Sequence, residues 1–527
     1  MPFLHQKAPG APEPAGPAAS WSPARLAALA GLAEGTGPAL EVTSPSEGRP
    51  LAVVRQAREG EARAAVDRAR EAQRAWAARP VRERAAVGHR FARLVLDRRD
   101  EILDLLQAET GKARLAALEE VMDASRTAAY YAHAAPRLLR PQRHVGALPL
   151  LTRSTELRHP KGVVGVITPW NYPFTLPASD SVPALLAGNA VVIKPDHQTP
   201  LTALLVLALL REAGLPEGVA RVVPGTGPVT GAELVDAVDY VMFTGSTATG
   251  RAIAARCGER LIGFSGELGG KNPLLVLPDA DIPAAAVGAA RACFSNAGQL
   301  CVGPERIYVH EAVRERFTEA FVAEVAGMRM GPGTSWETQL GSLTSPEHLA
   351  RVHSQLDDAV ARGARVLTGG AARPDVGPLF FAPTVLADVP ESAALCREET
   401  FGPIVAVYPV ASEEEAFARA NDTPYGLNAS LWTAPSRGRR LGARLEAGTV
   451  NVNEGYSAAW GTHSAAMGGW KESGLGRRHG PEGLLKYTEA QTIAVQRLLP
   501  IAPWPGLGGE RWAGLLTGAV RMINRFR

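Results

Sequence analysis

The part of the chain from Gly162 onward alternates between short apolar runs and helical segments, and this alternation constrains the fold most. The runs are rich in β-branched residues and are expected to be strands, whereas segments near 179–187 and 200–213 are expected to be helices. Strands that are apolar on both faces and separated by helices are typical of a parallel sheet covered on both sides. The pattern predicts a Rossmann-like unit with strands at 163–167, 190–193, 220–223 and 240–243.

A second series of the same kind begins near residue 283 and predicts another α/β domain. At 527 residues the chain is longer than one core usually organises, and its apolar content of 46% can fill two. We expect one domain from 23–140 together with 161–280, where 23–140 reads as a run of amphipathic helices, and a second domain from 281–486. The expected strands of the second domain are 306–309, 364–367, 429–432 and 450–453.

Four segments lie outside these two domains. Residues 1–22 are rich in Pro, Ala and Gly and predict a disordered or loosely draped arm, and Ser22-Pro23 is typical of a helix start. Segments 141–160 and 487–498 fit neither domain. Residues 499–527 contain an amphipathic helix with arginines around its apolar face, which could lie on an anionic membrane or, as we favour, dock on a second copy of the chain. The apolar face comprises Trp512, Leu515, Leu516, Ala519, Val520 and Ile523.

Charge and cysteine content exclude several classes of protein. The net charge of +3 is too small to indicate a nucleic-acid partner, and the arginines of the chain are dispersed along the sequence. The four cysteines suit neither a disulfide framework nor a zinc site, and no His, Asp or Glu ligand cluster suggests another metal. There is neither an apolar run long enough to span a membrane nor a secretory leader, so a cytoplasmic protein is expected.

Three residues in separate segments have the chemistry of a covalent catalyst. Cys301 follows small and polar residues in Ser295-Asn296-Ala297-Gly298-Gln299-Leu300, where a thiol can be reached by a ligand. Glu267 offers a carboxylate, although a structural pairing with Lys271 would also explain it. Asn171, between Trp170 and Tyr172, offers an amide that could face an oxyanion.

These segments and their order resemble the aldehyde dehydrogenase superfamily from about residue 35 to about residue 498. The likeness is strongest to its bacterial NADP-linked succinate-semialdehyde dehydrogenase branch. The resemblance implies that the first domain binds a dinucleotide, that the second is catalytic, and that 141–160 and 487–498 pair as an arm joining a homo-dimer or homo-tetramer. A surface hairpin is the alternative for that arm. The resemblance further implies that Cys301 attacks an aldehyde, Asn171 holds the oxyanion, and Glu267 activates the water that hydrolyses the thioester.

The resemblance also assigns a cofactor site. Gly245 and Ser246 follow a strand and open a helix, where free N–H groups suit a pyrophosphate. Because His197 stands where NAD-preferring relatives often carry a glutamate, NADP is the expected cofactor and NAD the alternative. The remaining residues implied for this site are Trp170, Lys194, Gly225, Glu399 and Phe401.

The substrate site is less defined. Animal members of the branch place arginines where this chain has Ser179 and Ser295, so these hydroxyls, His463 or Arg306 would have to bind a substrate carboxylate. Trp460 is expected at the mouth of the pocket and would also suit a medium-chain or aromatic aldehyde. A catalytically inert structural relative and an enzyme that passes the thioester to phosphate or coenzyme A are the remaining alternatives.

Overall fold

The structure is a computed structural model that describes residues 20–147, 151–497 and 500–525. Most of the arm predicted at 1–22 lies outside the described residues. The helix start predicted at Ser22-Pro23 is confirmed, because the Ser22 side chain accepts a hydrogen bond from the Arg25 N–H and Pro23 opens helix α1 (Pro23–Ala30). A hairpin of strands β1 (Ala39–Thr43) and β2 (Pro50–Arg55) follows.

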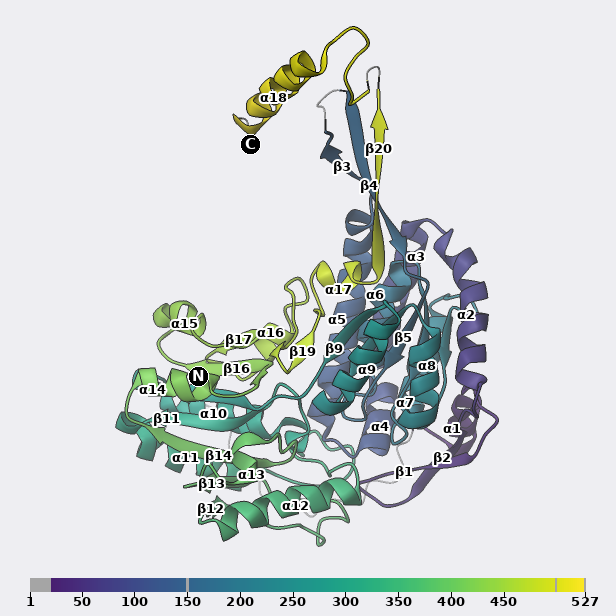
Figure 1. Cartoon of the computed structure of the whole chain (residues 1–527). Coiled ribbons are helices and arrows are strands. Elements are labelled where there is room, and N and C mark those ends of the chain that lie inside the picture. Colours follow the sequence, from purple (N-terminus) through teal and green to yellow (C-terminus); the bar gives the residue numbers. More distant parts are fainter. Residues whose placement is uncertain (1–19, 148–150, 498–499, 526–527) are drawn as a thin grey trace.

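The first α/β domain contains a six-stranded sheet in the order β19-β9-β8-β5-β6-β7. The five strands from β9 to β7 run parallel, whereas β19 pairs antiparallel at one edge. Helices cover this sheet in Figure 1, and the Rossmann-like prediction is confirmed. The strands are β5 (Val163–Ile167), β6 (Ala190–Lys194), β7 (Ala220–Val222), β8 (Tyr240–Thr244), β9 (Gly263–Glu267) and β19 (Gly474–Leu475).

Helix α6 (Thr175–Leu186) begins four residues earlier than the start expected at 179. Its first backbone N–H groups, at Phe174 and Thr175, donate to the carboxylate of Glu120, which lies on another helix. A cap supplied from 54 residues away leaves no local sequence signal. The other helices of this domain are α2 (Glu61–Ala77), α3 (Val81–Asp97), α4 (Arg99–Thr110), α5 (Arg114–Leu138), α7 (Pro200–Glu212), α8 (Ala232–Ala237) and α9 (Thr247–Glu259).

The second α/β domain contains a seven-stranded sheet in the order β12-β13-β14-β11-β10-β16-β17. The strand expected at 364–367 is the edge strand β12, and it pairs antiparallel with β13 because the connection between them has no crossover helix. The remaining pairs are parallel. The strands are β10 (Asn272–Val276), β11 (Pro304–His310), β12 (Arg365–Thr368), β13 (Thr384–Ala387), β14 (Ile404–Val410), β16 (Asn428–Trp432) and β17 (Thr449–Val452), and the main helices are α10 (Ile282–Phe294), α11 (Arg314–Ala326), α12 (Pro346–Ala361) and α14 (Glu413–Asn421).

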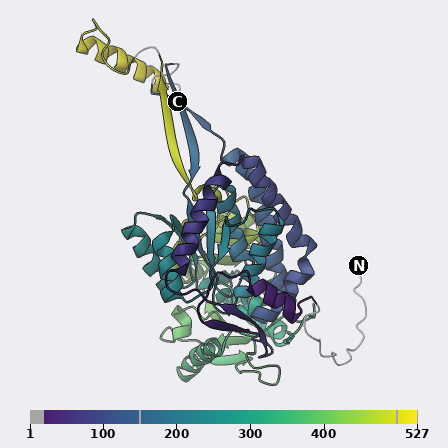
Figure 2. The same cartoon turned by 90° about the vertical axis from the view of Figure 1, so that its right-hand side faces the viewer.

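An antiparallel arm of three strands projects from these domains (Figures 1 and 2). Strand β4 (Thr152–Pro160) lies between β3 (Gln142–Val145) and β20 (Thr488–Gln496), so segments 141–160 and 487–498 do pair. Helix α18 (Gly509–Arg525) lies at the tip of the arm. Among the described residues, no helix has the length and apolar character needed to cross a membrane.

Candidate active site

The carboxyl ends of the parallel strands bring the predicted site residues together. Trp170 and Asn171 follow β5, Gly245 and Ser246 follow β8, and Glu267 ends β9. In an open α/β sheet this edge is where ligands bind, notably where the strand order reverses, as it does between β5 and β8. A cavity of about 860 Å³ lies there, and residues of the second domain, including Cys301, complete its wall.

Cys301 reaches this cavity from a tightly bent segment. Asn296, Ala297 and Gly298 have left-handed φ angles of 50°, 54° and 73° between helix α10 and strand β11. A Cβ atom at Gly298 would lie 2.1 Å from the carbonyl oxygen of Gly402, so only glycine lets these two backbones approach. The Asn272 amide donates to the Cys301 carbonyl over 2.7 Å and holds the end of the segment.

The Cys301 thiol is protonated near neutral pH in this arrangement. Burial raises its pKa to about 12, and the carboxylate of Glu399 acts in the same direction, while Arg478 opposes it. The protein environment alone therefore does not supply a thiolate at Cys301. An attack by this sulfur needs a neighbouring proton acceptor.

Glu267 is a carboxylate suited to that task. It is 5% exposed, lines the same cavity as Cys301, and its Oε1 has no hydrogen-bond partner among the described residues. Burial raises its pKa to about 7, against the attraction of Arg478. The alternative of a structural pair with Lys271 is wrong, because the Lys271 ammonium pairs with Glu305.

Asn171 is held on both its backbone and its side chain. Its side-chain amide donates one hydrogen bond to the Gln299 carbonyl over 3.0 Å, which leaves a second N–H for a ligand. Its backbone carbonyl accepts from the Lys112 ammonium over 2.6 Å. Lys112 in turn pairs with Glu120, and the two side chains are 1% and 0% exposed. Sequence reasoning missed this supporting pair.

Most of the residues expected at the cofactor site line the large cavity. Ser246 caps helix α9 by accepting from the Thr249 N–H, so the N-terminus of a 13-residue helix faces the cavity. The cavity walls include Trp170, Lys194, His197, Gly245, Ser246, Glu399 and Phe401.

Gly225 is not among the described residues that line this cavity. A Cβ atom at Gly225 would lie 1.9 Å from the Thr230 hydroxyl oxygen, so its glycine permits close packing of the backbone instead. Gly227 and Gly231, at the two ends of a π-helical turn, line the cavity in that region.

Basic side chains lie at the end of the cavity near β6, together with the acids Asp196 and Glu347. His197 is exposed, and its ring lies 3.2 Å from the Asp196 carboxylate, which raises the pKa of the imidazole. Asp196 also accepts from the Gln198 N–H, so protein donors engage its carboxylate. The Lys194 ammonium donates to the Pro195 carbonyl over 2.9 Å. Arg256 also lines the wall, and its guanidinium pairs with the Asp236 carboxylate.

Glu399 and Phe401 form the opposite wall. The Glu399 carboxylate accepts from the Gly270 N–H over 2.9 Å, and burial raises its pKa to about 7. The Phe401 ring packs edge-on against Trp170 with centroids 5.6 Å apart. Buried Glu305 accepts hydrogen bonds from the Thr400 and Phe401 N–H groups and fixes this turn. The position of Glu305 within strand β11 gives no sequence signal of this role.

A second cavity of about 160 Å³ adjoins the first, since Tyr172 and Trp460 line both. Trp460 and His463, two of the residues predicted for the substrate site, lie in its wall. Ser179 and Ser295 are not among its lining residues. The Ser179 hydroxyl donates to Asp123.

Arg306 does not reach either cavity. It is buried, and its guanidinium donates to backbone carbonyls of Lys271, Arg419 and Ala420. The suggestion that Arg306 binds a substrate carboxylate is therefore wrong.

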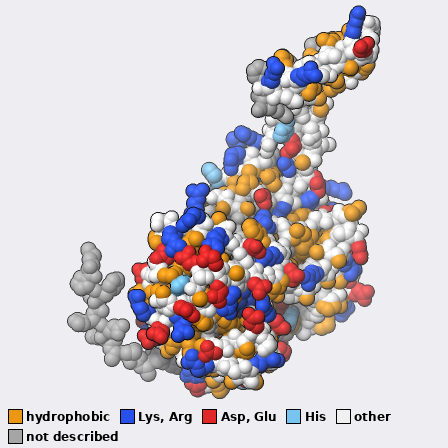
Figure 3. Space-filling model, turned by 60° about the vertical axis from the view of Figure 1, so that its left-hand side comes forward, with side chains coloured by type: hydrophobic (Ala, Val, Ile, Leu, Met, Phe, Trp, Pro, Cys, Tyr) orange, Lys and Arg blue, Asp and Glu red, His pale blue; other side chains and the backbone are white. Residues whose placement is uncertain are grey.

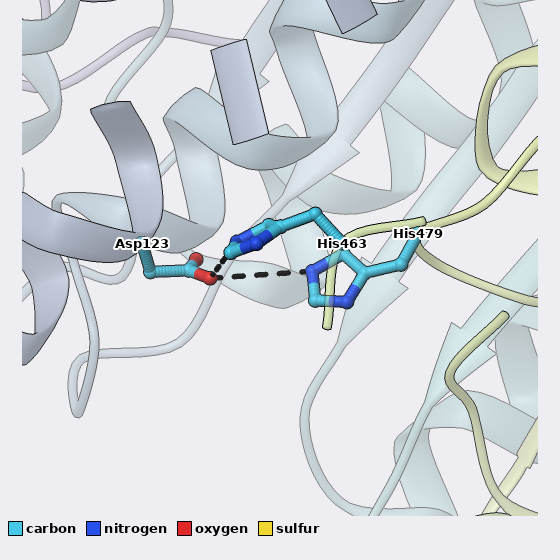
Figure 4. A group of neighbouring side chains, drawn as sticks. All are labelled: Asp123, His463 and His479. Atoms are coloured by element: carbon cyan, nitrogen blue, oxygen red, sulfur yellow. Dashed lines mark hydrogen bonds and ion pairs between the residues drawn. The ribbon is translucent and has the colours of Figure 1, made fainter. Parts of the chain in front are cut away.

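Figure 4 shows a buried group formed by Asp123, His463 and His479, of which Asp123 and His463 line the second cavity. His463 Nε2 lies 3.0 Å from Asp123, and its Nδ1 lies 3.0 Å from the Gly461 carbonyl. Both ring nitrogens of His479 are without a hydrogen-bond partner in the part of the chain that the structure describes. Two imidazoles and a carboxylate are ligands that divalent cations accept, so the expectation of no such cluster is corrected. Three distant segments supply the group, and their spacing gave no signal.

Two α/β domains that share a dinucleotide-sized cleft define the class as a two-domain oxidoreductase that uses a nicotinamide cofactor. The model of the aldehyde dehydrogenase family matches residues 32–493, and the chain belongs to this family. The resemblance noted in the sequence is confirmed.

Relatives and solved structures agree with the family. The chain is 53% identical over 455 residues, 86% of this chain and 88% of the relative, to a Mycolicibacterium smegmatis protein named "Putative succinate-semialdehyde dehydrogenase" with NADP(+) as the cofactor in its name. A Mycobacterium tuberculosis protein with the same activity and cofactor in its name is 51% identical over 91% of this chain and 92% of its own length. The crystal structure of an E. coli NADP-dependent enzyme superposes with a TM-score of 0.83 and 36% identity, over 87% of this chain and 95% of that one.

Proposed function

We propose that the protein oxidises succinate semialdehyde to succinate with NADP as the hydride acceptor. The observation that carries the reaction is the placement of Cys301, Glu267 and Asn171 on the wall of one cavity. The names of the relatives that are 51–53% identical over most of the chain support the substrate and the cofactor.

The residues divide the chemistry between them. Glu267 accepts the proton of the Cys301 thiol, and the sulfur forms a bond to the aldehyde carbon. The free N–H of the Asn171 amide faces the oxygen on which negative charge develops. A nicotinamide bound in the large cavity would accept the hydride that leaves the thiohemiacetal. After the thiol proton has passed to solvent, the Glu267 carboxylate takes a proton from water, whose oxygen attacks the thioester, so that succinate leaves and the sulfur is freed.

The cation-lined end of the cavity fits a 2′-phosphate. Lys194 and His197, whose pKa is raised by Asp196, supply the attraction for a dianionic group, and Asp196 itself is engaged by protein donors. Helix α9 offers its N-terminus to the pyrophosphate. These features support NADP ahead of NAD.

The test is pre-steady-state kinetics of the purified chain with succinate semialdehyde and NADP. We expect steady turnover for the unaltered enzyme, and for Glu267→Gln at least a hundredfold slower formation of NADPH in both the first and the later turnovers, because this carboxylate serves as the base in both steps. Cys301→Ala should form no NADPH. A Glu267→Gln enzyme with unaltered turnover would remove this carboxylate from the base role.

A second candidate activity is the oxidation of medium-chain or aromatic aldehydes. The aromatic rings of Tyr172, Tyr456 and Trp460 in the small cavity favour it. A kcat/KM for hexanal or benzaldehyde above that for succinate semialdehyde would establish it in place of the first.

We further infer that the arm joins copies of the chain into a homo-dimer or homo-tetramer. Ile493 and Val495 on β20 are 44% and 50% exposed, and α18 exposes Leu515, Val520 and Met522. Figure 3 shows hydrophobic side chains on the projecting arm and helix. Apolar surface of this extent on a projecting element is typical of a protein interface.

A further inference from the structure

One face of helix α5 forms a wall of the small cavity. Its residues Glu119, Met122, Asp123 and Arg126 follow the spacing of three and four that places side chains on one side of a helix. Arg126 is exposed at the outer end of this row. The cavity therefore has a cation near its opening and meets the cavity of Cys301 at Tyr172 and Trp460.

The two acids of this wall are already engaged by protein donors. The Glu119 carboxylate accepts from the Tyr456 hydroxyl over 2.7 Å and from the Tyr172 hydroxyl over 3.4 Å. The Asp123 carboxylate accepts from Ser179 over 3.1 Å, from Thr175, and from His463. Neither carboxylate needs a ligand cation to complete its hydrogen bonds.

Arg126 is in the opposite situation. Across the described residues its guanidinium has neither an ion pair nor a hydrogen bond, although it offers five N–H donors. His463, the other basic group of this cavity, places both ring nitrogens against Gly461 and Asp123. Ser179 is engaged by Asp123, and Arg306 is buried elsewhere.

We infer that Arg126 binds the carboxylate of an ω-carboxylated aldehyde and is the residue that selects succinate semialdehyde over uncharged aldehydes. This inference rests on the proposed function. A guanidinium fork matches a carboxylate in shape and charge, and its position at the opening lets the acid end remain partly hydrated while the aldehyde end reaches Cys301.

The experiment compares two substrates of one length, succinate semialdehyde and methyl 4-oxobutanoate, in which an ester masks the acid. For Arg126→Gln we expect KM for the acid to rise about tenfold or more, with kcat and the kinetics of the ester changed less than about twofold. Arg126→Lys should lie between, because it keeps the charge and loses the fork. Arg137→Gln, which alters an exposed arginine on the same helix outside the cavity, is the matched control.

Ionic strength gives an independent readout. Added salt should raise KM for the acid in the unaltered enzyme and have little effect in Arg126→Gln, since the attraction it screens is gone. Equal losses for acid and ester in Arg126→Gln, or none for either, would overturn the assignment. An unaltered enzyme that prefers the ester, or a cationic substrate such as 3-aminopropanal, would instead refute the proposed substrate.

Discussion

The buried pair of Lys112 and Glu120 leads to a prediction in which a second substitution restores stability but does not restore catalytic activity. Burial is the largest influence on both groups, lowering the pKa of the Lys112 ammonium and raising that of the Glu120 carboxyl. Desolvation thus opposes both charges, and the pair stabilises the fold only while both partners are present. Lys112→Met should lower the free energy of unfolding by about 3 to 5 kcal/mol, because it leaves the Glu120 carboxylate buried and unpaired.

The double variant Lys112→Met/Glu120→Gln should recover most of this loss. The neutral amide that replaces the carboxylate keeps a side-chain oxygen, which can still accept from the Phe174 and Thr175 N–H groups, and no buried charge remains. The double-mutant cycle should therefore give an interaction energy of about 3 kcal/mol. The exposed pair of Arg373 and Asp375, with side chains 41% and 61% exposed, is the control and should give less than about 1 kcal/mol.

Catalytic activity should not recover with stability. The Lys112 ammonium also holds the backbone carbonyl of Asn171, and the double variant lacks that hydrogen bond. We expect kcat to stay about tenfold low in both variants, because a loosened oxyanion donor costs part of what a deleted one costs. Guanidinium denaturation and steady-state assays measure the two effects. If Lys112→Met unfolds like the unaltered enzyme, or if kcat returns together with stability in the double variant, the positioning role is refuted.

Two further predictions follow from the base and from the tip of the arm. Burial raises the pKa of Glu267 to about 7, and the carboxylate is its active form as a base. The kcat should therefore fall about tenfold for each pH unit below that value. A flat profile of kcat between about pH 6 and pH 8 would contradict the role of Glu267 as base. Deleting residues 505–527 removes the apolar surface of α18 and should lower the particle mass measured by light scattering; an unchanged mass with a loss of liposome binding would assign the helix to a membrane instead.

Features determined by neighbouring residues could be predicted from the sequence. The β-branched runs became the parallel strands β5, β6 and β8, and Ser22-Pro23 became a helix start, because hydrophobic periodicity and capping act over a few residues. The resemblance to the family likewise located Cys301, Glu267 and Asn171, which the structure places on one cavity wall.

Features that join distant segments could not be predicted in this way. Glu120 caps α6 from another helix, and the Asp123 group draws its members from positions 123, 463 and 479. The resemblance pointed to Ser179 and Ser295 as substrate-binding residues, yet Ser179 donates to Asp123 and neither serine is among the residues that line the two cavities. The spacing of Glu119, Met122, Asp123 and Arg126 is a local signal, but which face of α5 borders a cavity depends on tertiary packing.

Helix α5 also connects two parts of the site. Glu120 fixes the start of α6 and, through Lys112, the loop of Asn171, whereas Arg126 lies six residues further along the same helix, about 9 Å at the rise of an α-helix. If Arg126 binds the substrate carboxylate as inferred, one rigid helix therefore holds both Arg126 and the side chain that supports the Asn171 loop, so the two cannot move independently. Semialdehyde acids one carbon shorter or longer would then reach either the Arg126 guanidinium or the Asn171 amide, but not both. Selectivity for chain length would thus depend on a helix backbone and not on the shape of a flexible loop.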